Sequence, residues 1–589
     1  MLTAALLFLV AALGQQAPAA PAPTLHALER DAGWRSLFDG RSLAGWKSHG
    51  SAAPVQGWEV RDGCLVRTGA GGDLVTIEEF GDFELEFEFR LAAGTNSGVK
   101  YRVQERAGQS GMLGPEYQLL DDAAHPATAA RHRTAALYDV LAPAAAPDLP
   151  VAVLPAGTWN HARIVAQDGR IEHWLNGIRV IRADTGGAAW AAARAASKFA
   201  GAVGFAEPAR GRIGLQDHGG EAWFRRIHLR ELDKLPGTEV ALFAGAGTAG
   251  WGTVGDAVWT RLADGGLHGE VGGGAQSFLV SDREFADFLF EVDVTLHDRG
   301  NSGIQVRSHM RPQGGLFGYQ IEIDPSPRAW SAGLYDEDRR GWLDDLADRP
   351  QARAAFRMDG PNRFRVECVG PWIRTWIDGV PAADHFDPLD LSGALGFQVH
   401  SGRNTSVDWT GLRFRDLGRR AWRPAVQAGA LHGFEPQRGL WTIADGVVAG
   451  SADAAGPPTL ATSNPRGDIS LRARVRANGG ALRIGLRLPG AAMPAAEPGS
   501  VGEPPFPEVT LEAAGGGSAA LRLPGSAPEW RSVHVQAYGS RLVVHVDGSL
   551  LLDRMVEDLR PDGQIVFALQ GGPGATLELA DLAFLEKLP

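Results

Sequence analysis

Cysteine is nearly absent from this sequence of 589 residues, which contains only Cys64 and Cys368. The two residues lie in different repeats of the chain, which are described below, so the sequence holds no disulfide framework. Each cysteine stands in a strand-like pattern, where a small residue is typical of a buried position. We therefore expect both to be small buried strand residues.

Long apolar runs are also scarce. The only candidate, residues 2–13, has 12 residues, whereas a membrane-spanning helix needs about 20. Gln-, Ala- and Pro-rich sequence follows it, an order typical of a secretory signal, although no Lys or Arg precedes the run. We expect a signal peptide over residues 1–19, export to the periplasm or the extracellular space, and no membrane-spanning segment. A disordered cytoplasmic tail is the alternative interpretation.

The sequence has no basic block, and its net charge is −12, which argues against nucleic acid as a partner. Apolar residues make up 44% and charged residues 21%, which excludes disorder as the main state. At about 150 residues per domain, the length predicts two to four domains. The 77 glycines and 17 tryptophans favour turn-rich β structure over helical bundles.

Internal repeats organise the chain, because the same motifs recur in the same order at separations of about 200 residues. The motifs are a Trp before an Asp-Gly turn, an Asn-Ser-Gly strand start, a Leu-Tyr-Asp segment and a late hairpin turn. The matched positions are Trp58 and Trp259, Asn96 and Asn301, Leu137 and Leu334, and Asn176 and Asp378. A third, shorter copy keeps Trp441 and the hairpin turn at Asp547. We place the copies at residues 25–235, 236–418 and 419–589.

Each copy has the sequence pattern of β-strands. Residues 83–89 alternate strictly between apolar and polar, and residues 288–294 and 469–475 repeat the alternation. Asn176-Gly177 and Asp547-Gly548 are strong hairpin turns. Helical periodicity is confined to residues 188–198. The sequence predicts an all-β protein of three tandem two-sheet antiparallel sandwiches, with the recurring Trp58, Trp259 and Trp441 in the cores.

Several motifs of the first copy resemble the 3-keto-disaccharide hydrolase domain family, and the second copy resembles it more loosely. The motifs are Leu37-Phe38-Asp39-Gly40, Asn96-Ser97-Gly98-Val99-Lys100-Tyr101-Arg102, Gly114-Pro115-Glu116-Tyr117-Gln118, Glu172-His173-Trp174 and Gln216-Asp217-His218-Gly219. The resemblance implies a concanavalin- or laminin-G-like jelly roll. It also implies cleavage of an oxidised (3-keto) disaccharide or glycoside. The third copy resembles only the generic sandwich.

A ketone at C3 of a sugar acidifies the hydrogen on C2, so cleavage can proceed by C2 proton abstraction, loss of the C1 substituent and addition of water. Such a site needs a base near C2, a donor or cation for the enolate oxygen, and an acid for the leaving oxygen. Period-2 alternation puts Glu116 and Gln118 on one strand face. The catalytic candidates are Glu116, Asp121, His125 and His218. The substrate-binding candidates are Asn96, Lys100, Arg102, Gln118, Tyr138, Asp139, His173 and Gln216.

Several alternatives stay open. Asn96 could serve a turn, Arg102 a structural ion pair, and His173 could be packed in the core rather than contact sugar. No cofactor is certain, but Glu116, Asp121, His125 and His218 together could bind a divalent cation. The second copy, with Glu322 and Asp324, could be a binding domain or active in a new way. The rival function is a non-catalytic carbohydrate-binding protein, and the oligomeric state is unknown.

Overall fold

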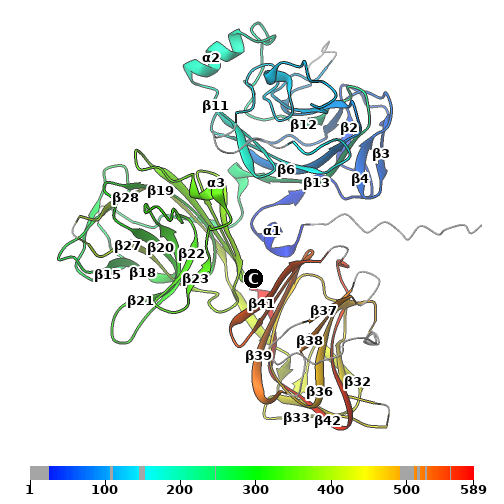
Figure 1. Ribbon diagram of the computed structural model, residues 1–589, viewed down its shortest axis with the longest axis vertical. Coiled ribbons are helices and arrows are strands. Elements are labelled where there is room, and N and C mark those ends of the chain that lie inside the picture. Colours follow the sequence, from blue (N-terminus) through cyan, green and yellow to red (C-terminus); the bar gives the residue numbers. More distant parts are fainter. Residues whose placement is uncertain are drawn as a thin grey trace, which may run out of the picture.

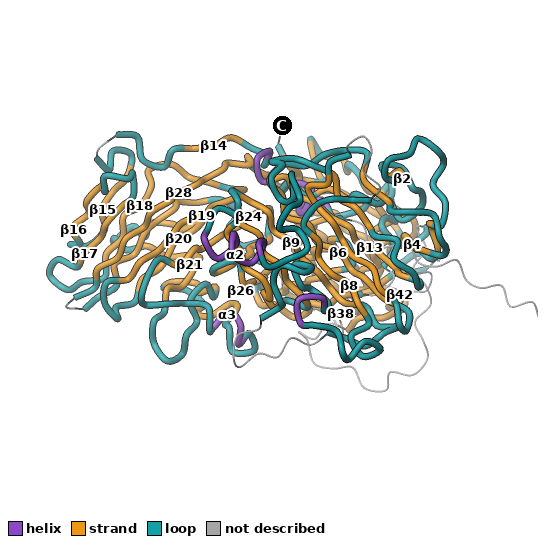
Figure 2. Tube along the Cα trace, turned by 90° about the horizontal axis from the view of Figure 1, so that it is seen from above, coloured by secondary structure: helices purple, strands orange, loops and turns teal. Residues whose placement is uncertain are grey.

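The computed structural model describes residues 25–105, 111–144, 153–245, 247–402, 404–454, 456–490, 510–513, 518–523, 527–556 and 559–588. Three β-rich lobes follow one another along the chain (Figure 1). Strands fill each lobe, and the few helices are short (Figure 2). The prediction of an all-β protein with three sandwich copies is confirmed. The predicted signal peptide at residues 1–19 lies outside the described residues.

The first copy packs a large sheet against a small one. The large sheet has the order β11-β10-β9-β6-β13-β4-β3, with β1 on β13, and the small sheet has the order β2-β5-β12-β7-β8. The large-sheet strands are β1 (Arg35–Ser36), β3 (Trp58–Arg61), β4 (Cys64–Arg67), β6 (Phe83–Leu91), β9 (Asn160–Gln167), β10 (Arg170–Leu175), β11 (Ile178–Asp184) and β13 (Ala222–Glu231). The small-sheet strands are β2 (Trp46–Ser48), β5 (Leu74–Thr76), β7 (Asn96–Val103), β8 (Glu116–Leu120) and β12 (Arg212–Leu215).

The core of the first copy lies between these two sheets. Alternate residues of β6, including Phe83, Phe87 and Phe89, point inward and meet Val99 and Tyr117 from the small sheet. Because side chains alternate along a strand, the neighbours of Val99 and Tyr117 must point to the other face of the small sheet. The core packing thus decides which polar residues share that outer face.

The second copy repeats this topology. Its large sheet has the order β26-β25-β24-β19-β28-β17-β16, with β14 on β28, and its small sheet has the order β15-β18-β27-β20-β21-β22-β23. The large-sheet strands are β14 (Thr238–Val240), β16 (Val258–Arg261), β17 (Leu267–Glu270), β19 (Asp287–Leu296), β24 (Asn362–Val369), β25 (Trp372–Ile377), β26 (Val380–Phe386) and β28 (Ser406–Gly418). The small-sheet strands are β15 (Trp251–Val254), β18 (Ser277–Phe285), β20 (Ser302–Met310), β21 (Leu316–Ile323), β22 (Leu334–Glu337), β23 (Gly341–Asp344) and β27 (Gly393–Val399).

The third copy contains two very long strands, and the two halves of each pair with different neighbouring strands. The first half of β36 (Ile469–Leu488) pairs with β39 (Ala527–Tyr538), and its second half pairs with β38 (Ala519–Leu523). Both halves pair with β42 (Gln564–Lys587), so hydrogen bonding is continuous through the lobe. The remaining strands are β29 (Arg420–Pro424), β30 (Val426–Gln427), β31 (Ala430–Leu431), β32 (Phe434–Arg438), β33 (Leu440–Ala444), β34 (Val447–Ser451), β35 (Thr459–Thr462), β37 (Thr510–Ala513), β40 (Arg541–Val546) and β41 (Ser549–Met555).

Several local predictions are confirmed. Asn176 and Asp547 adopt positive φ angles in the turns of the β10–β11 and β40–β41 hairpins. Cys64 and Cys368 are free and buried. Trp58 is buried in the core, whereas Trp259 and Trp441 are half-buried and pack against the cores of their copies.

The helices are α1 (Ala27–Asp31), α2 (Ala188–Ala195) and α3 (Pro350–Arg353), with short 3₁₀ turns η1 (Ala130–His132) and η2 (Leu232–Lys234). None of the helices among the described residues is long and apolar enough to cross a membrane. Helix α1 lies at the centre, between the lobes (Figure 1). Its Leu28 is buried in a cluster with Trp372 of the second copy and Tyr538 of the third. The N-terminal helix therefore links all three copies.

Buried ion pairs join the first two copies. Arg230 of β13 donates to Glu84 of β6 and, across the interface, to Glu367 of β24, both at 2.6 Å. Arg365 of β24 reaches back to Glu84 at 3.2 Å. All of these side chains lie on outward strand faces, which alternation alone would leave to solvent. Each copy covers the side chains of the other at this interface.

Candidate functional site

Strands β7 and β8 set the site on the outer face of the small sheet in the first copy. Lys100 lies directly opposite Glu116, and Gly98 lies opposite Gln118. Glu116 lies over Gly98, where an added Cβ would approach Glu116 Oε1 to 2.2 Å. The glycine of the Asn-Ser-Gly motif therefore makes room for the carboxylate, in addition to any role in a turn. The predicted shared face of Glu116 and Gln118 is present.

Glu116 is a buried carboxyl group beside a lysine. Its side chain is 3% exposed, and Lys100 Nζ lies 3.4 Å from Glu116 Oε2. Lys100 also donates to the Met112 carbonyl at 3.1 Å. Burial raises the pKa of Glu116, while the charges of Lys100, Lys198 and His218 oppose that rise. The group is therefore suited to exchange a proton, because its charged form is neither freely solvated nor fully paired.

Lys198 is a residue of the site that we did not predict. Lys198 lies shortly after helix α2. Asp139 fixes its main chain, because Asp139 Oδ2 accepts a hydrogen bond from Lys198 N–H at 2.6 Å. Lys198 Nζ lies 4.3 Å from the centre of the Tyr138 ring. Burial lowers the pKa of Lys198, and the Lys100 charge lowers it further, whereas Glu116 and Asp139 raise it. The one available signal was a lone lysine directly after an alanine-rich helix.

Tyr138 and Asp139 lie next to the strand that carries Glu116, but their side chains make different contacts. Tyr138 N–H donates to the Glu116 carbonyl at 3.0 Å, and burial and the Glu116 charge raise the pKa of its phenol. Asp139 is 5% exposed and accepts from His132 at 2.7 Å. Burial would raise the pKa of Asp139, but the hydrogen bonds from Lys198 and His132 outweigh burial and lower it. Asp139 therefore positions Lys198 and does not face a substrate.

The remaining polar candidates lie beside this group. Gln118 Nε2 donates to Asn96 Oδ1 at 2.9 Å, so the amides extend the polar face along β7 and β8. Gln216 N–H donates to the Gly98 carbonyl at 2.9 Å, which puts Gln216 next to the motif glycine. His218 is exposed on the loop after β12. It lies near enough for its charge to lower the pKa of Glu116.

The structure separates Asp121 and His125 from this group. Asp121 follows the far end of β8, five residues from Glu116, a distance of roughly 17 Å along an extended strand. Its Oδ2 accepts from Gly94 N–H at 2.8 Å, and His125 Nε2 contacts the Gly94 carbonyl at 3.3 Å. Both side chains hold the turn between β6 and β7. The structure therefore does not bring Asp121 and His125 together with Glu116, which both the catalytic assignment and the open possibility of a cation cluster required.

Arg102 and His173 are also misassigned as sugar contacts. Arg102 has a φ of 53°, and this left-handed residue breaks the alternation that would put it beside Lys100. Its guanidinium instead pairs with Asp82 at 2.9 Å. His173 is fully buried, with Nε2 2.9 Å from the Tyr101 hydroxyl and Nδ1 3.1 Å from the Ala135 carbonyl. Burial lowers the pKa of His173 to about 4, so it is a neutral core residue.

The second copy carries a rearranged version of the polar face. Strand pairing puts Gln305 opposite Gln320 and Gly303 opposite Glu322. By register, Gln320 occupies the place of Glu116 and Glu322 the place of Gln118. Glu322 accepts from Gln320 at 2.9 Å, and Gln305 replaces the lysine. Asp324 accepts from Arg328 at 2.8 Å and fixes its own loop. The set of one carboxyl and two lysines is therefore absent from these positions of the second copy.

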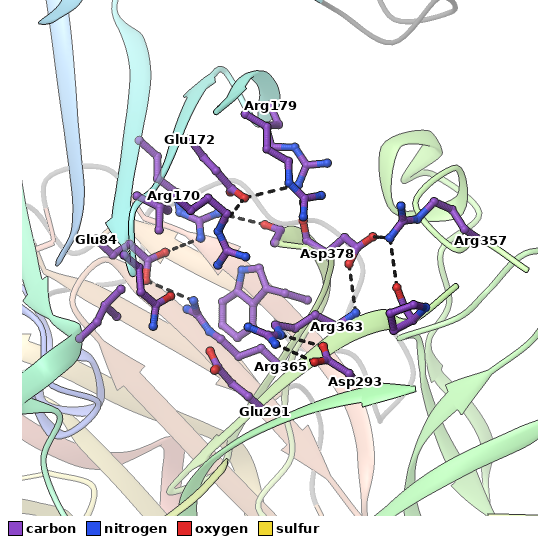
Figure 3. Close-up of a pocket in the computed structure, with 18 residues that line it drawn as sticks. Glu84, Arg170, Glu172, Arg179, Glu291, Asp293, Arg357, Arg363, Arg365 and Asp378 are labelled. Atoms are coloured by element: carbon purple, nitrogen blue, oxygen red, sulfur yellow. Dashed lines mark hydrogen bonds and ion pairs between the residues drawn. The ribbon is translucent and has the colours of Figure 1, made fainter. Parts of the chain in front are cut away.

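A separate cavity of about 260 Å³ lies between the first and second copies (Figure 3). Its walls carry arginines that are paired with carboxylates: Arg163 with Glu84 at 2.5 Å, and Arg363 with Asp293 at 2.7 Å. Arg179 donates to the Asp378 carbonyl across the interface at 2.6 Å. The two ion pairs each lie within one copy, whereas the Arg179 contact joins the two copies. The cavity lies outside the polar face that carries Glu116.

Comparisons with known proteins agree on one family. The family described as "3-keto-alpha-glucoside-1,2-lyase-like domain" matches residues 33–230 and again residues 238–418. A 3-keto-disaccharide hydrolase of Bacteroides thetaiotaomicron is 31% identical over 234 residues, which cover 34% of this chain and 79% of that protein.

Two solved structures from Parabacteroides distasonis, each described as a candidate glycosyl hydrolase, are also similar. The first is 29% identical with a TM-score of 0.34 and covers 36% of this chain and 100% of its own. The second is 25% identical with a TM-score of 0.27 and covers 34% of this chain and 99% of its own. On the two tandem matches and the curated relative, the chain belongs to the 3-keto-alpha-glucoside-1,2-lyase-like domain family.

Proposed function

We propose that this protein is a glycosidase that cleaves 3-keto-glycosides, including 3-keto-disaccharides, at the outer face of the small sheet in its first copy. The name of the curated relative supports this class of substrate. The observation that carries the proposal is the buried Glu116 carboxyl, with Lys100 Nζ at 3.4 Å and Lys198 close enough to affect its pKa. A base next to two cations is what abstraction of a proton beside a ketone requires.

The proposed reaction begins with Glu116 taking the proton from C2 of the oxidised sugar. The C2–H electrons form the C2–C3 double bond of an enolate, whose oxygen is stabilised by Lys100 or Lys198. The enolate then re-forms the ketone, and the C1–O bond breaks as a C1–C2 double bond forms. The leaving oxygen takes a proton from Tyr138 or His218, the nearby groups that can donate one. Water adds at C1 and a proton returns to C2, so the net reaction is hydrolysis.

The electrostatics of the site support a carboxylate that is a stronger base than an ordinary glutamate. A fully solvated carboxylate is a weak base, and burial makes the Glu116 carboxylate a stronger one by raising its pKa. The lysines limit that rise, so the carboxylate form remains available. They also lie where negative charge develops in the reaction, and this favours the transition state over the ground state.

We further propose that the protein is exported after removal of residues 1–19. Helix α1 begins at Ala27, so a cut in that region leaves the helix that links the three copies intact. Sequencing of the mature N-terminus and fractionation of the native host test this proposal. A chain that keeps Met1 and stays in the cytoplasm would overturn it.

The test of activity is incubation of the purified protein with 3-keto-trehalose or a 3-keto aryl glucoside, with release of glucose or the aglycone as the readout. Glu116→Gln keeps the size of the side chain and removes the base, so release is expected to fall about 10²–10⁴-fold. Glu322→Gln is the matched control, because Glu322 is a buried carboxyl group on the same face of the second copy. It is expected to keep the activity.

Two other outcomes would count against the proposal. Loss of activity in Glu322→Gln but not in Glu116→Gln would move the active site to the second copy. Unchanged substrate with the wild-type protein, together with measurable binding of the sugar, would favour the non-catalytic carbohydrate-binding protein. Unfolding midpoints close to the wild-type value are needed for both variants.

A further inference from the structure

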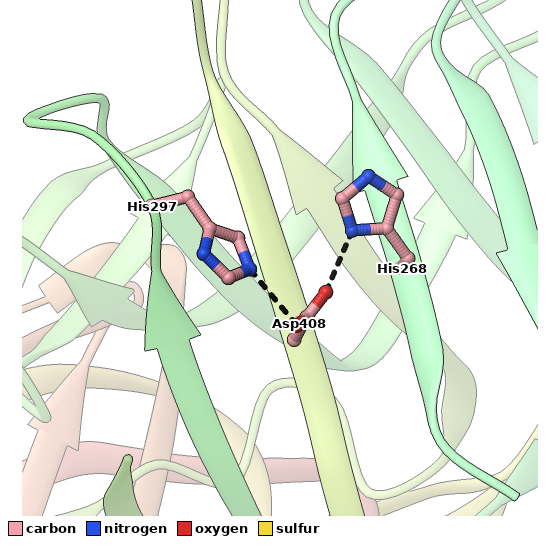
Figure 4. Close-up of side chains that lie close together, drawn as sticks. All are labelled: His268, His297 and Asp408. Atoms are coloured by element: carbon pink, nitrogen blue, oxygen red, sulfur yellow. Dashed lines mark hydrogen bonds and ion pairs between the residues drawn. The ribbon is translucent and has the colours of Figure 1, made fainter. Parts of the chain in front are cut away.

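Three side chains with metal-binding chemistry meet on the outer face of the large sheet in the second copy. His268 comes from β17, Asp408 from β28, and His297 directly follows β19 (Figure 4). Strand β28 lies between the other two, and His268 is directly opposite Asp408 in the register. Since the ligands are carried by adjacent hydrogen-bonded strands, their backbone positions are fixed by the sheet itself.

The donor atoms are already close together. His268 Nδ1 lies 2.6 Å from Asp408 Oδ1, and His297 Nε2 lies 2.8 Å from Asp408 Oδ2. One donor atom from each residue falls within 4.8 Å of the others. Glu270, two residues after His268 on the same strand face, has Oε2 4.0 Å from His268 Nε2. Two imidazoles and the Asp408 carboxylate are thus available at one point of the surface, whereas Glu270 faces the other ring nitrogen of His268.

The same three-strand region of the first copy has different chemistry. There, Val66 of β4 is opposite Trp223 of β13, which is opposite Arg90 of β6. The Arg90 guanidinium stacks over the Trp223 ring at 4.3 Å. The first copy therefore forms its sandwich with an apolar and cation–π cluster at this place. The two histidines and the aspartate are not needed to form the sandwich, and some other property of the second copy accounts for them.

We propose that His268, His297 and Asp408 bind a divalent transition-metal ion of the Zn²⁺ type. Imidazole and carboxylate ligands suit such ions, and mixed sites of this composition are common for Zn²⁺. Tetrahedral coordination at about 2.1 Å separates donor atoms by about 3.4 Å. The two contacts with Asp408, at 2.6 and 2.8 Å, must therefore open, while the widest spacing in the cluster, at most 4.8 Å, must close by up to about 1.4 Å. His297 is 46% exposed and lies beyond the end of its strand, so rotation of its side chain can supply that movement.

The bound ion would cross-link three neighbouring strands of the large sheet. An ion that binds the folded state but not the unfolded state stabilises the folded state by mass action. The unfolding temperature of the second copy should therefore rise with the concentration of the ion. The cluster lies on the large sheet, whereas Glu116 lies on the small sheet of another copy. Occupancy of the metal site should therefore leave cleavage of 3-keto-glycosides unchanged.

The experiment is calorimetric titration of the chelator-treated full-length protein with ZnCl₂, with the unfolding temperature as a second readout. The wild type is expected to bind one more equivalent of Zn²⁺ than Asp408→Asn or His268→Gln, and only the wild type should gain stability from that equivalent. His400→Gln is the control, because His400 is a half-buried histidine of the same copy outside the cluster.

A second measurement covers the case in which a variant fails to fold. Titration of the wild type with Co²⁺ should give the intense visible absorption of a tetrahedral site with nitrogen and oxygen ligands, and added Zn²⁺ should remove it. His297→Gln changes a half-exposed side chain and should lose the signal while remaining folded. Equal stoichiometry in the wild type and all variants, or absence of the Co²⁺ signal in the wild type, would overturn the proposal.

Discussion

Glu116 combines a buried position with nearby positive charge, and the balance between the two decides its reactivity. Burial raises the pKa of its carboxyl group, and Lys100 is the first charge that opposes this rise. A carboxyl group that acts as a base is active only when it is deprotonated. The acid limb of the pH profile should therefore lie above the ordinary pKa of glutamate, which is 4.5.

Removal of the Lys100 charge tests this balance. In Lys100→Met the pKa of Glu116 rises further, because burial is then opposed less, and the acid limb of kcat/KM moves to higher pH. The measurement is the pH dependence of 3-keto-glycoside cleavage. Lys234→Met is the control, since Lys234 is exposed and pairs with Glu231. An acid limb in the same place in wild type and Lys100→Met would show that another group limits the rate at low pH.

Gly98 allows a second test at the residue level. An added methyl group would approach Glu116 Oε1 to 2.2 Å, so Gly98→Ala must displace the carboxylate. We expect a large loss of kcat and a decrease in the free energy of unfolding of about 1–3 kcal/mol. Gly69→Ala is the matched control, because its Cβ would have no atom within 4 Å. Full activity of Gly98→Ala would mean that the position of Glu116 is unimportant.

Strand alternation explains how far the site could be predicted at this scale. The period of two placed Glu116 and Gln118 on one face correctly, because β8 is regular. The same rule failed for Arg102, where a φ of 53° reverses the direction of the side chain. His173 could not be assigned by alternation, since a buried polar residue and a ligand contact follow the same pattern. Its hydrogen bonds to Tyr101 and Ala135 decide the question.

At the scale of elements, the turn between β6 and β7 depends on Asp121. The Asp121 carboxylate accepts from Gly94 N–H at 2.8 Å, at the opposite end of β8 from Glu116. Asp121→Ala should therefore lower the free energy of unfolding by about 1 kcal/mol and keep most of the activity. Denaturant unfolding and cleavage kinetics of the same preparation provide the comparison. A loss of kcat as large as that in Glu116→Gln would restore Asp121 to the catalytic group.

The contact of Lys198 with the site is what the sequence could not predict. A helix near residues 188–198 was predicted from its periodicity, and α2 confirms it. Its contact with the site depends on Asp139, which accepts from Lys198 N–H and lies 59 positions earlier in the chain. Contacts between distant loops leave no periodic signal in a sequence, so only the fold brings Lys198 to Glu116.

At the scale of the whole molecule, the interface between the first two copies depends on buried charge. Arg230 is 2% exposed and pairs with Glu84 and Glu367 at 2.6 Å each. Arg230→Met would leave two buried carboxylates with less compensation, and we expect a loss of about 3–5 kcal/mol in the free energy of unfolding. Calorimetry of the full-length chain measures it. Arg415→Met is a suitable control, because Arg415 is half-buried at the junction and pairs with the exposed Glu239. A wild-type unfolding profile for Arg230→Met would contradict the assigned role.

The same interface should weaken in acid. Burial alone would raise the pKa of Glu367, but the charges of Arg230, Arg365 and Arg374 outweigh it and lower the pKa to about 2. Because the folded pKa is lower than the unfolded value of 4.5, the unfolded state binds more protons between these two values. The stabilisation is complete above pH 4.5 and is lost as the pH falls towards 2. Unfolding midpoints that stay constant over this range would contradict the prediction.

Repetition in the sequence is sufficient to predict three sandwiches but not their arrangement. Motifs such as those at Asn96 and Asn301 mark equivalent strands in two copies, because each copy must form the same core. Arg230 and Glu84, in contrast, stand at positions that alternation assigns to an outward face, and a sequence does not tell solvent from a neighbouring copy. The central place of α1 is likewise invisible until the packing of Leu28 is known.

The most direct test of the account is the kinetic effect of deuterium at C2 of a 3-keto-glycoside. If Glu116 of the first copy removes the C2 proton in the slow step, the wild-type protein should cleave the C2-deuterated substrate several-fold more slowly than the ordinary substrate. Glu116→Gln should lose cleavage of both. Equal rates for the two substrates, with Glu116→Gln still active, would contradict proton abstraction by Glu116 and the active site described for the first copy.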